Sequence, residues 1–184
     1  MPTAPPPSSG AELARELLRD AFGRVAESVP HVVAGLDGED LSWRPDPGAN
    51  SIGWLVWHLS RVQDDHLADL AGVDQAWVAD GWVERFGLPY AAPATGYGMS
   101  TAEVDAFAVS DPAVLSGYHD AVHRLTLRVL RDLDTEGLTR VVDRRWDPPV
   151  TALVRLVSVV NDTTQHVGQA AYVRGLLERR APGS

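Results

Sequence analysis

Asp162 and His166 lie four residues apart in the segment NDTTQHVGQAAY, residues 161–172, whose pattern is otherwise that of a helix. Side chains four apart on an α-helix differ by about 40° in direction and roughly 6 Å in height, so both can reach one point in space. A carboxylate and an imidazole that meet can bind a divalent metal ion, or they can form an ion pair on a solvated helix face. The spacing alone gives these two interpretations equal weight.

A third metal ligand must come from another helix, and the best candidate is His58 in SIGWLVWHLSRVQDDH, residues 51–66. The flanking residues Leu55 and Leu59 place His58 near the buried side of that helix. Three protein ligands with open coordination positions are typical of a catalytic metal site in a helix bundle. Asp65 lies seven residues further on, about 20° away on the same face, and is the candidate catalytic residue, as a base or as an orienting group. The alternative for His58 is a core histidine with satisfied hydrogen bonds.

Other histidines are weaker candidates for the site. His66 points further round the same helix than Asp65. His119 and His123 are also four residues apart, in the sequence YHDAVH, but nothing else near them indicates a site. We therefore predict that this second pair lies on a helix surface.

The composition limits the chemistry that any site can carry. The 184-residue chain contains no cysteine, which excludes disulfides, thiolate nucleophiles and cysteine-type zinc sites, so a metal ion must be held by nitrogen and oxygen atoms. The net charge of −9 and the lack of a basic cluster argue against a nucleic-acid partner. Lysine is absent and all sixteen basic residues are arginine, which together with abundant Ala, Gly and Pro predicts an actinobacterial host of high genomic GC content.

The chain ends and apolar runs bear on location and domain organisation. No apolar run approaches the roughly 18 residues of a membrane span, and the N-terminal sequence MPTAPPPSSG lacks the charged and apolar regions of a signal peptide. We therefore expect a cytoplasmic protein without a membrane partner. Residues 1–9 are expected to form a disordered tail, with Ser9 as the cap of the first helix. Residues 10–180 are expected to form a single domain.

Hydrophobic periodicity predicts a first helix over residues 11–29, with Pro30 near its end. Charged residues in this segment lie off the apolar stripe, as on the solvated face of an amphipathic helix. The apolar face is expected at every fourth residue. These residues are Leu13, Leu17, Ala21 and Val25.

Three further helices are predicted, over residues 52–71, 112–133 and about 151–178, and residue types that cap helices precede the first two of them. Residues 73–109 are rich in glycine, proline and aromatic residues and are expected to form a long loop with one short helix. Residues 137–150 are expected to form an extended hairpin arm or a loop. The sequence therefore predicts an all-α protein, a four-helix bundle with long connecting loops.

Two motifs in combination resemble a known family. The run LSWRPDPGANSIGWLVWHLSRVQDDHLADLAG is followed about a hundred residues later by NDTTQHVGQAAYVRGLL, and together they resemble the DinB-like superfamily, including its mycothiol-dependent and bacillithiol-dependent branches. The resemblance covers nearly the whole chain and implies a four-helix bundle that holds a divalent metal ion. By this resemblance the metal ligands are His58, Asp162 and His166. The family more often has His or Glu where this chain has Asp162, and the shorter carboxylate could shift the metal ion.

The resemblance also implies a chemistry of thiol transfer, in which a metal ion lowers the pKa of a low-molecular-weight thiol that attacks an electrophile. An actinobacterial host makes mycothiol the expected thiol, and a chain without cysteine must take its thiol from outside. We therefore expect a mycothiol S-transferase or isomerase-like enzyme that acts on a small electrophile. Zinc, nickel, manganese and iron all suit two histidines and a carboxylate.

Other functions fit the same residues. One alternative is a metal-dependent hydrolase, in which bound water replaces the thiol, and another is a noncatalytic metal-binding or stress-responsive bundle. A third is a structural bundle that pairs two copies, and members of the resembled family are often dimeric.

Further side chains could shape the site or could be structural. The aromatic residues from Trp77 to Tyr90, with Trp54 and Trp57, either form a pocket mouth or pack in the core, and core packing is favoured. Four polar residues either bind sugar hydroxyls or carboxylates near the metal ion or are simply solvated. These residues are Arg61, Gln165, Gln169 and Arg174.

Overall fold

The computed structural model describes residues 9–180, so the predicted tail lies outside the described residues apart from Ser9. Ser9 begins helix α1 (Gly10–Val33) through a capping box. Its hydroxyl accepts a hydrogen bond from the backbone N–H of Glu12, and the Glu12 carboxylate accepts one from the Ser9 N–H. A cap of this kind stabilises a helix start by about 1 kcal/mol.

The end of α1 lies beyond the predicted one, because the helix continues through Pro30 to Val33. Val32 and Val33 are buried, so the last turn gains apolar packing that a helix ending at Pro30 would lose. Arg174 also donates hydrogen bonds from Nη1 to the carbonyl groups of His31, Val32 and Ala34, at 2.7, 3.0 and 2.9 Å. These carbonyls at the end of the helix have no partner within α1.

The apolar face of α1 is also displaced from its prediction. Leu13 and Leu17 are 50% and 73% exposed, whereas Val25 is buried. Residues four apart drift by about 40° per step around a helix, so a stripe that reaches the core at Val25 lies well away from it three steps earlier. The side chains of α1 that enter the core are Leu18, Phe22, Val25, Val29, Val32 and Val33.

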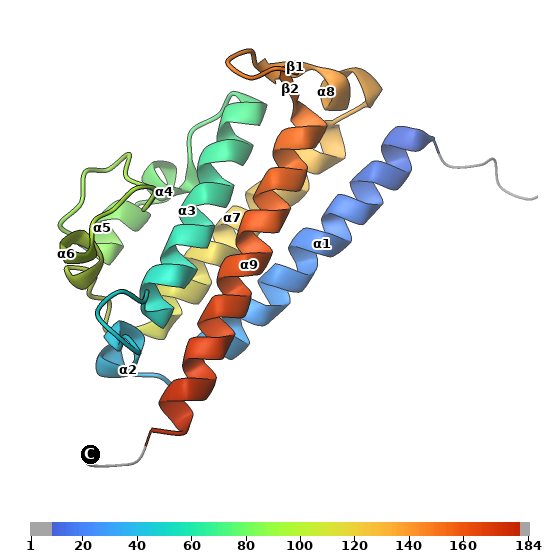
Figure 1. Cartoon of the computed structure of the whole chain (residues 1–184). Helices are drawn as coiled ribbons and strands as arrows, with labels where there is room; N and C mark the ends of the chain where they lie inside the picture. Colours follow the sequence, from blue (N-terminus) through green and yellow to red (C-terminus); the bar gives the residue numbers. More distant parts are fainter. Residues whose placement is uncertain (1–8, 181–184) are drawn as a thin grey trace, which may run out of the picture.

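Three further long helices complete the predicted four-helix bundle: α3 (Ile52–Ala71), α7 (Pro112–Asp132) and α9 (Ala152–Glu178). Figure 1 shows that α1 and α9 run in one direction and that α3 and α7 run in the other. Helix α3 packs against α7 and α9, and both of these pack against α1. A short helix, α2 (Gly38–Ser42), lies between α1 and α3 in the chain.

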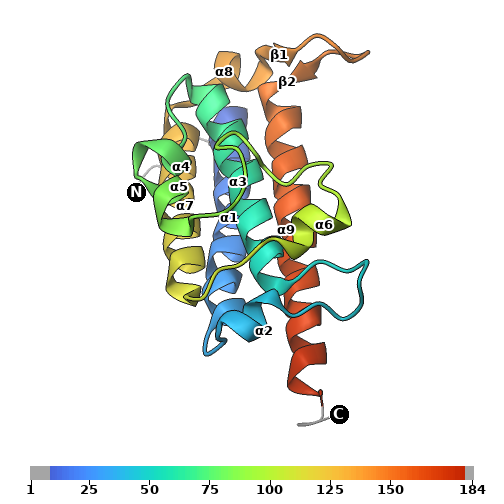
Figure 2. The same ribbon diagram turned by 90° about the vertical axis from the view of Figure 1, so that its left-hand side faces the viewer.

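A long crossover joins α3 to α7 and covers the side of α3 that faces away from α1 (Figures 1 and 2). The sequence predicted one short helix here, but the segment contains three: α4 (Ala76–Ala79), α5 (Trp82–Phe86) and α6 (Thr101–Asp105). Helices of four or five residues are too short to show a helical period in the sequence. Because the crossover covers α3, residues 51–61 are all buried.

A hairpin connects α7 to α9 at the end of the bundle where α9 begins (Figure 1). After α8 (Thr135–Thr139), strand β1 (Val141–Asp143) pairs antiparallel with β2 (Val150–Thr151). Of the two structures expected for residues 137–150, a hairpin arm or a loop, the structure shows the hairpin, preceded by α8. Strand β2 leads directly into α9, so the hairpin stands over the first turns of that helix.

The core confirms one expectation about side chains and corrects another. The aromatic residues of α3 and the crossover are core residues, as favoured from the sequence: Trp54, Trp57, Trp77, Trp82 and Phe86. His119, predicted on a helix surface, is 1% exposed. Helix α7 packs against both α1 and α3, so its buried face is wide enough to include His119. Within residues 9–180, no helix is both long and apolar enough to cross a membrane.

Candidate metal centre

His58 projects from α3 into the core and is 6% exposed. Its Nδ1 lies 2.5 Å from the carbonyl oxygen of Thr95, in the crossover. A carbonyl oxygen only accepts hydrogen bonds, so Nδ1 carries the hydrogen and the neutral ring keeps its lone pair on Nε2. A histidine that donates its other ring N–H to a carbonyl group is oriented for metal binding through the free nitrogen.

The crossover holds His58 closely because Gly96 follows Thr95. A Cβ atom on Gly96 would lie 2.6 Å from His58 Nδ1, and Gly96 has a φ of +95°. Only glycine combines this close approach with this backbone conformation. The imidazole also stacks on Trp54, with ring centroids 4.7 Å apart and an interplanar angle of 15°. The ring therefore has little freedom to turn.

Asp162 and His166 supply the second half of the site from α9. His166 Nδ1 lies 2.8 Å from the carbonyl oxygen of Asp162 and 3.6 Å from its carboxylate Oδ2. The shorter contact is the hydrogen bond, so His166 also keeps a free Nε2. Oδ2 of Asp162 is buried and has no hydrogen-bond partner among the described residues. A buried carboxylate oxygen without a partner is costly, and a bound cation would satisfy it.

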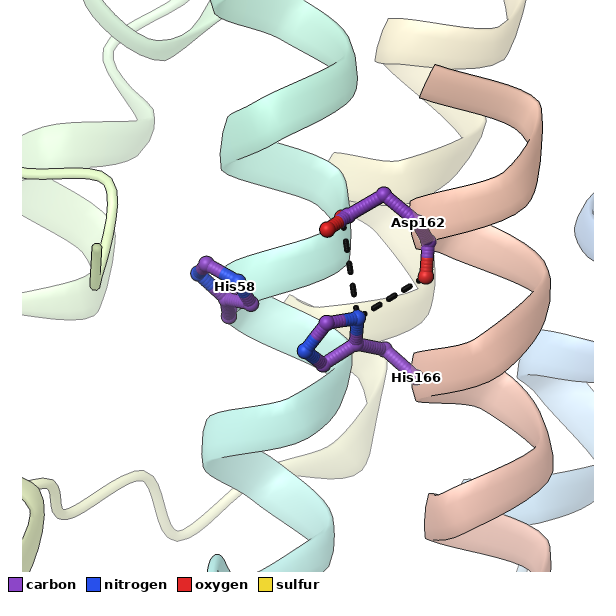
Figure 3. Close-up of side chains that lie close together, drawn as sticks. All are labelled: His58, Asp162 and His166. Carbon is purple, nitrogen blue, oxygen red and sulfur yellow. Dashed lines mark hydrogen bonds and ion pairs between the residues drawn. The ribbon is translucent and has the colours of Figure 1, made fainter. Parts of the chain in front are cut away.

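Figure 3 shows Asp162 and His166 extending from α9 towards α3 and His58. Each offers one ligand atom, and the three atoms lie within 4.8 Å of one another. The rings of His58 and His166 have their centroids 4.6 Å apart. Atoms bonded to one ion at about 2.0–2.2 Å lie roughly 3–4 Å apart, so the three ligand atoms need to approach one another only slightly to bind one ion. The residues present therefore fit a divalent metal ion with two imidazoles and one carboxylate.

The charge state of His58 also suits a ligand. Burial lowers the pKa of His58, and the hydrogen bond to Thr95 opposes this shift. The nearby His166 lowers the same pKa further, whereas Asp162 raises it. The net effect favours the neutral imidazole, which is the form that coordinates metal ions.

A cavity of about 730 Å³ opens beside the three residues, and we call it the hairpin cavity. His58 and Asp162 form part of its wall, together with Asp65 and His66 from the later turns of α3. Residues of the hairpin and the exposed Tyr97 of the crossover also line it. Its volume lies within the roughly 300–1,000 Å³ typical of small-molecule sites.

The comparison with known families decides where this chain belongs. The model of the mycothiol-S-transferase family matches residues 17–179, a range that includes His58, Asp162, His166 and the walls of the hairpin cavity. The chain belongs to the mycothiol-S-transferase family. The resemblance inferred from the two motifs is thereby confirmed.

Two known proteins are similar to this family member. A crystal structure described as that of a conserved protein from Enterococcus faecalis superposes with a TM-score of 0.84 and 31% identity, covering 90% of this chain and 97% of that one. A protein of Mycolicibacterium vanbaalenii named argininosuccinate lyase is 28% identical over 171 residues, which are 82% of this chain. The chain spans only 36% of the length of that relative.

Asp65, the residue expected to act as a base or orienting group, lines the hairpin cavity with its carboxylate about half exposed. Gln75 Nε2 donates a hydrogen bond to Asp65 Oδ1 at 2.7 Å, and Arg61 Nη2 donates to Gln75 Oε1 at 2.8 Å. This chain of hydrogen bonds fixes one carboxylate oxygen of Asp65. Sequence reasoning missed Gln75, because this residue comes from the crossover rather than from a long helix.

His66 lines the same cavity but takes no part in the three-ligand group. Its Nδ1 lies 3.0 Å from Arg155 Nη1, which only donates, so the imidazole accepts this hydrogen bond. Burial lowers the pKa of His66, and the charge of Arg155 lowers it further. The lower rank given to His66 from the sequence agrees with this arrangement.

The hairpin contributes side chains that sequence reasoning missed. Asp143 accepts hydrogen bonds from Arg145 at 2.8 Å and from Arg155 at 3.3 Å through the same Oδ2 atom. The Arg145 guanidinium, its backbone N–H and the charge of Arg155 hold the pKa of Asp143 well below its usual range. Trp146, at the exposed end of the hairpin, also lines the cavity. The only sequence signal was the run VVDRRW before two prolines, which indicated a hairpin but not what it faces.

The four polar residues considered as sugar or carboxylate binders have different environments. Arg61 is completely buried and donates to Ala94 and to Tyr118, so it is structural. Arg174 binds the last carbonyls of α1. Gln165 is exposed and donates to the carbonyl group of Asn161 one turn earlier. Gln169 lines a second cavity next to the site.

Proposed function

We propose that this protein is a metal-dependent thiol S-transferase that joins mycothiol to a small electrophile. The observation that carries the proposal is the convergence of His58, Asp162 and His166, with ligand atoms within 4.8 Å, at the wall of a cavity large enough for a substrate. Membership of the mycothiol-S-transferase family supports the choice of reaction and of thiol.

His58, Asp162 and His166 would hold the metal ion, each through one atom. A divalent ion at this place supplies Lewis acidity, which lowers the pKa of a thiol bound to it. Zinc, nickel, manganese and iron are all compatible with this donor set. The absence of cysteine means that the nucleophilic sulfur must come from the thiol co-substrate.

Asp65 would act as the general base in this reaction. The thiol must lose its S–H proton before sulfur attacks, and a carboxylate in the same cavity can accept it. The hydrogen bond from Gln75 Nε2 to Oδ1 leaves Oδ2 to take the proton. The new C–S bond then forms as the leaving group of the electrophile departs with its bonding electron pair. Each turnover thus consumes one thiol and releases one leaving group and one proton.

The proposal extends to location, host and assembly. A reduced thiol co-substrate requires a reducing compartment, which supports a cytoplasmic location. The arginine-only set of basic residues supports an actinobacterial host. Exposed apolar side chains near the start of α1 and of α9 support a homodimer, and sedimentation velocity would measure it. These side chains are Leu13, Leu17, Val154 and Val157.

The test is turnover by protein reconstituted with zinc, nickel, manganese or iron, with mycothiol as thiol and 1-chloro-2,4-dinitrobenzene as model electrophile. We expect a thioether product that requires both metal and thiol, and about a 100-fold lower kcat in Asp65→Asn with unchanged metal content. Hydrolysis of an activated ester without thiol would instead indicate the hydrolase alternative. Metal binding without any turnover, for this and other electrophiles, would indicate the noncatalytic bundle.

A further inference from the structure

A second cavity lies on the opposite side of the ligand group from the hairpin cavity. It has a volume of about 680 Å³ and is formed where the loop of residues 45–50 faces the later turns of α9; we call it the loop cavity. Figure 2 shows this loop beside the lower half of α9, while the hairpin stands at the upper end of the bundle.

The order of residues along the two helices places the ligand group between the cavities. On α9 the hairpin cavity uses residues 155–162, whereas the loop cavity uses residues 168–176. On α3, which runs the opposite way, the loop cavity uses Leu55 and the hairpin cavity uses residues 58–66. Leu55 and Gln169 are each three residues, roughly 4.5 Å along the helix, from His58 and His166. On both helices the loop cavity therefore begins about one helical turn from the ligand group.

The chemistry of the loop cavity differs from that of the hairpin cavity. The hairpin cavity contains two guanidinium groups, Arg145 and Arg155, both paired with the single carboxylate of Asp143. Among residues 9–180, no basic side chain lines the loop cavity. Its polar groups are the amides of Asn50 and Gln169, the carboxylate of Asp46 and the hydroxyl of Tyr172.

This set of groups suits an uncharged molecule with many hydroxyls. Planar amides offer a donor and an acceptor side by side, which matches neighbouring hydroxyl groups on a ring. Tyr172 is 66% exposed, so one of its faces is available for the apolar C–H face of such a ring. Leu55 and Val173 give the cavity a buried apolar floor. An anionic ligand would find a carboxylate and no cation here, and is disfavoured.

We infer that the loop cavity binds the hydroxyl-rich, sugar-like body of the thiol co-substrate, while the hairpin cavity receives the electrophile. Gln169 and Tyr172 are the specificity-determining residues for the thiol, because both lie on α9 one to two turns beyond His166. This assignment rests on the proposed function and deepens it, since it separates the two substrates of one site.

The test compares a sugar-bearing thiol with one that lacks the sugar. In the double variant Gln169→Ala/Tyr172→Ala, we expect KM for mycothiol to rise by about tenfold or more, with unchanged kcat. KM for N-acetylcysteine and the metal content should stay at parental values. Both side chains are exposed, and alanine favours helices, so the variant should fold. The matched control is Gln165→Ala, an exposed glutamine on the same helix outside both cavities.

A binding measurement keeps this inference separate from the proposed function. Calorimetry with S-methyl mycothiol, whose sulfur cannot react, should show binding to the parent and to Gln165→Ala, with affinity about tenfold weaker in the double variant. This result is expected even if no electrophile is turned over. Three results would overturn the inference. These are no binding of S-methyl mycothiol to the parent, binding to the double variant as strong as to Gln165→Ala, and an equal rise in KM for mycothiol and N-acetylcysteine.

Discussion

Two helices of this protein carry a titratable pair at the same four-residue spacing, and only one pair forms a candidate site. On α9, Asp162 and His166 face His58 of α3 at the wall of a cavity. On α7, His119 lies in the core, where its Nδ1 is 3.0 Å from the Ser60 hydroxyl, and His123 is partly buried beside it. Spacing along one helix therefore does not make a site. A ligand from a facing helix and a carboxylate oxygen without a partner are also required.

The two pairs also differ in electrostatics. Burial, with a smaller contribution from neighbouring His123, lowers the pKa of His119 to about 3. At the α9 pair, in contrast, Asp162 raises the pKa of His58 against the effect of burial. A positive charge is therefore unfavourable at His119, whereas at His58 the carboxylate of Asp162 partly offsets the cost of burying one.

The largest expected effect separates the pairs directly. We expect the parent to bind about one divalent metal ion per chain and His166→Ala to lose more than nine-tenths of it, because two remaining ligands hold an ion poorly. His123→Ala is the matched control on α7 and should keep the parental metal content. Plasma mass spectrometry of protein purified without chelator measures both. Equal loss in the two variants would place the metal ion elsewhere or show a general effect on folding.

A second variant tests whether the crossover orients His58 for metal binding. In Gly96→Ala the new Cβ would lie 2.6 Å from His58 Nδ1, so the Thr95 carbonyl must move away from the ring. Loss of a group that orients a ligand weakens metal affinity by about 10–100-fold. Gly98→Ala is the control, because Gly98 also has a positive φ, of +72°, but nothing lies within 4 Å of its Cβ position. Competition with a chromophoric chelator measures zinc affinity, and equal weakening in both variants would show that only backbone strain matters.

His119 of the α7 pair should make the stability of the folded protein depend on pH. His119 has a pKa of about 3 in the folded protein and 6.5 when unfolded, so between these values the unfolded chain binds the additional proton. Stability is therefore fully present above pH 6.5 and falls as the pH decreases towards 3. Between pH 8 and pH 5 this residue should account for a loss of about 2 kcal/mol. Urea unfolding of His119→Gln should show a correspondingly smaller loss over that range, whereas an unchanged loss would mean that His119 is not the group that titrates.

The smallest effect belongs to a third pair with the same spacing. Asp120 and Arg124 form an ion pair on the exposed face of α7, next to the two histidines in the chain. Exposed pairs contribute little because water and salt screen them, so Asp120→Asn should change the free energy of unfolding by less than about 0.5 kcal/mol. Urea unfolding measures this too. A decrease of more than about 1 kcal/mol in the free energy of unfolding would show that exposure does not determine how much these ion pairs stabilise the protein.

The sequence predicts the framework of this protein well because its signals are local. The helix α3 begins after Ser51 and ends at Gly72 as predicted, since capping and stop residues act within one turn. His58 was also correctly placed on the buried side. The face of α1 was wrong because a four-residue repeat drifts around the helix, and the surface position of His119 was wrong because α7 packs against two partners.

The surroundings of the site were beyond the reach of the sequence. The hydrogen bond from His58 to Thr95 joins residues 37 positions apart, and that from Arg155 to His66 joins residues 89 apart. Such contacts depend on how the crossover and the hairpin fold back onto the bundle, and no periodicity encodes this. The two cavities have the same origin, since each is closed by a connecting segment rather than by a long helix.

The most direct test of the central claim is anomalous diffraction at the zinc edge from crystals of protein reconstituted with zinc. We expect one strong peak per chain between α3 and α9, bonded to one imidazole nitrogen each from His58 and His166 and to a carboxylate oxygen of Asp162. A peak at His66 or at the His119–His123 pair, or no peak within bonding distance of His58, would contradict the account.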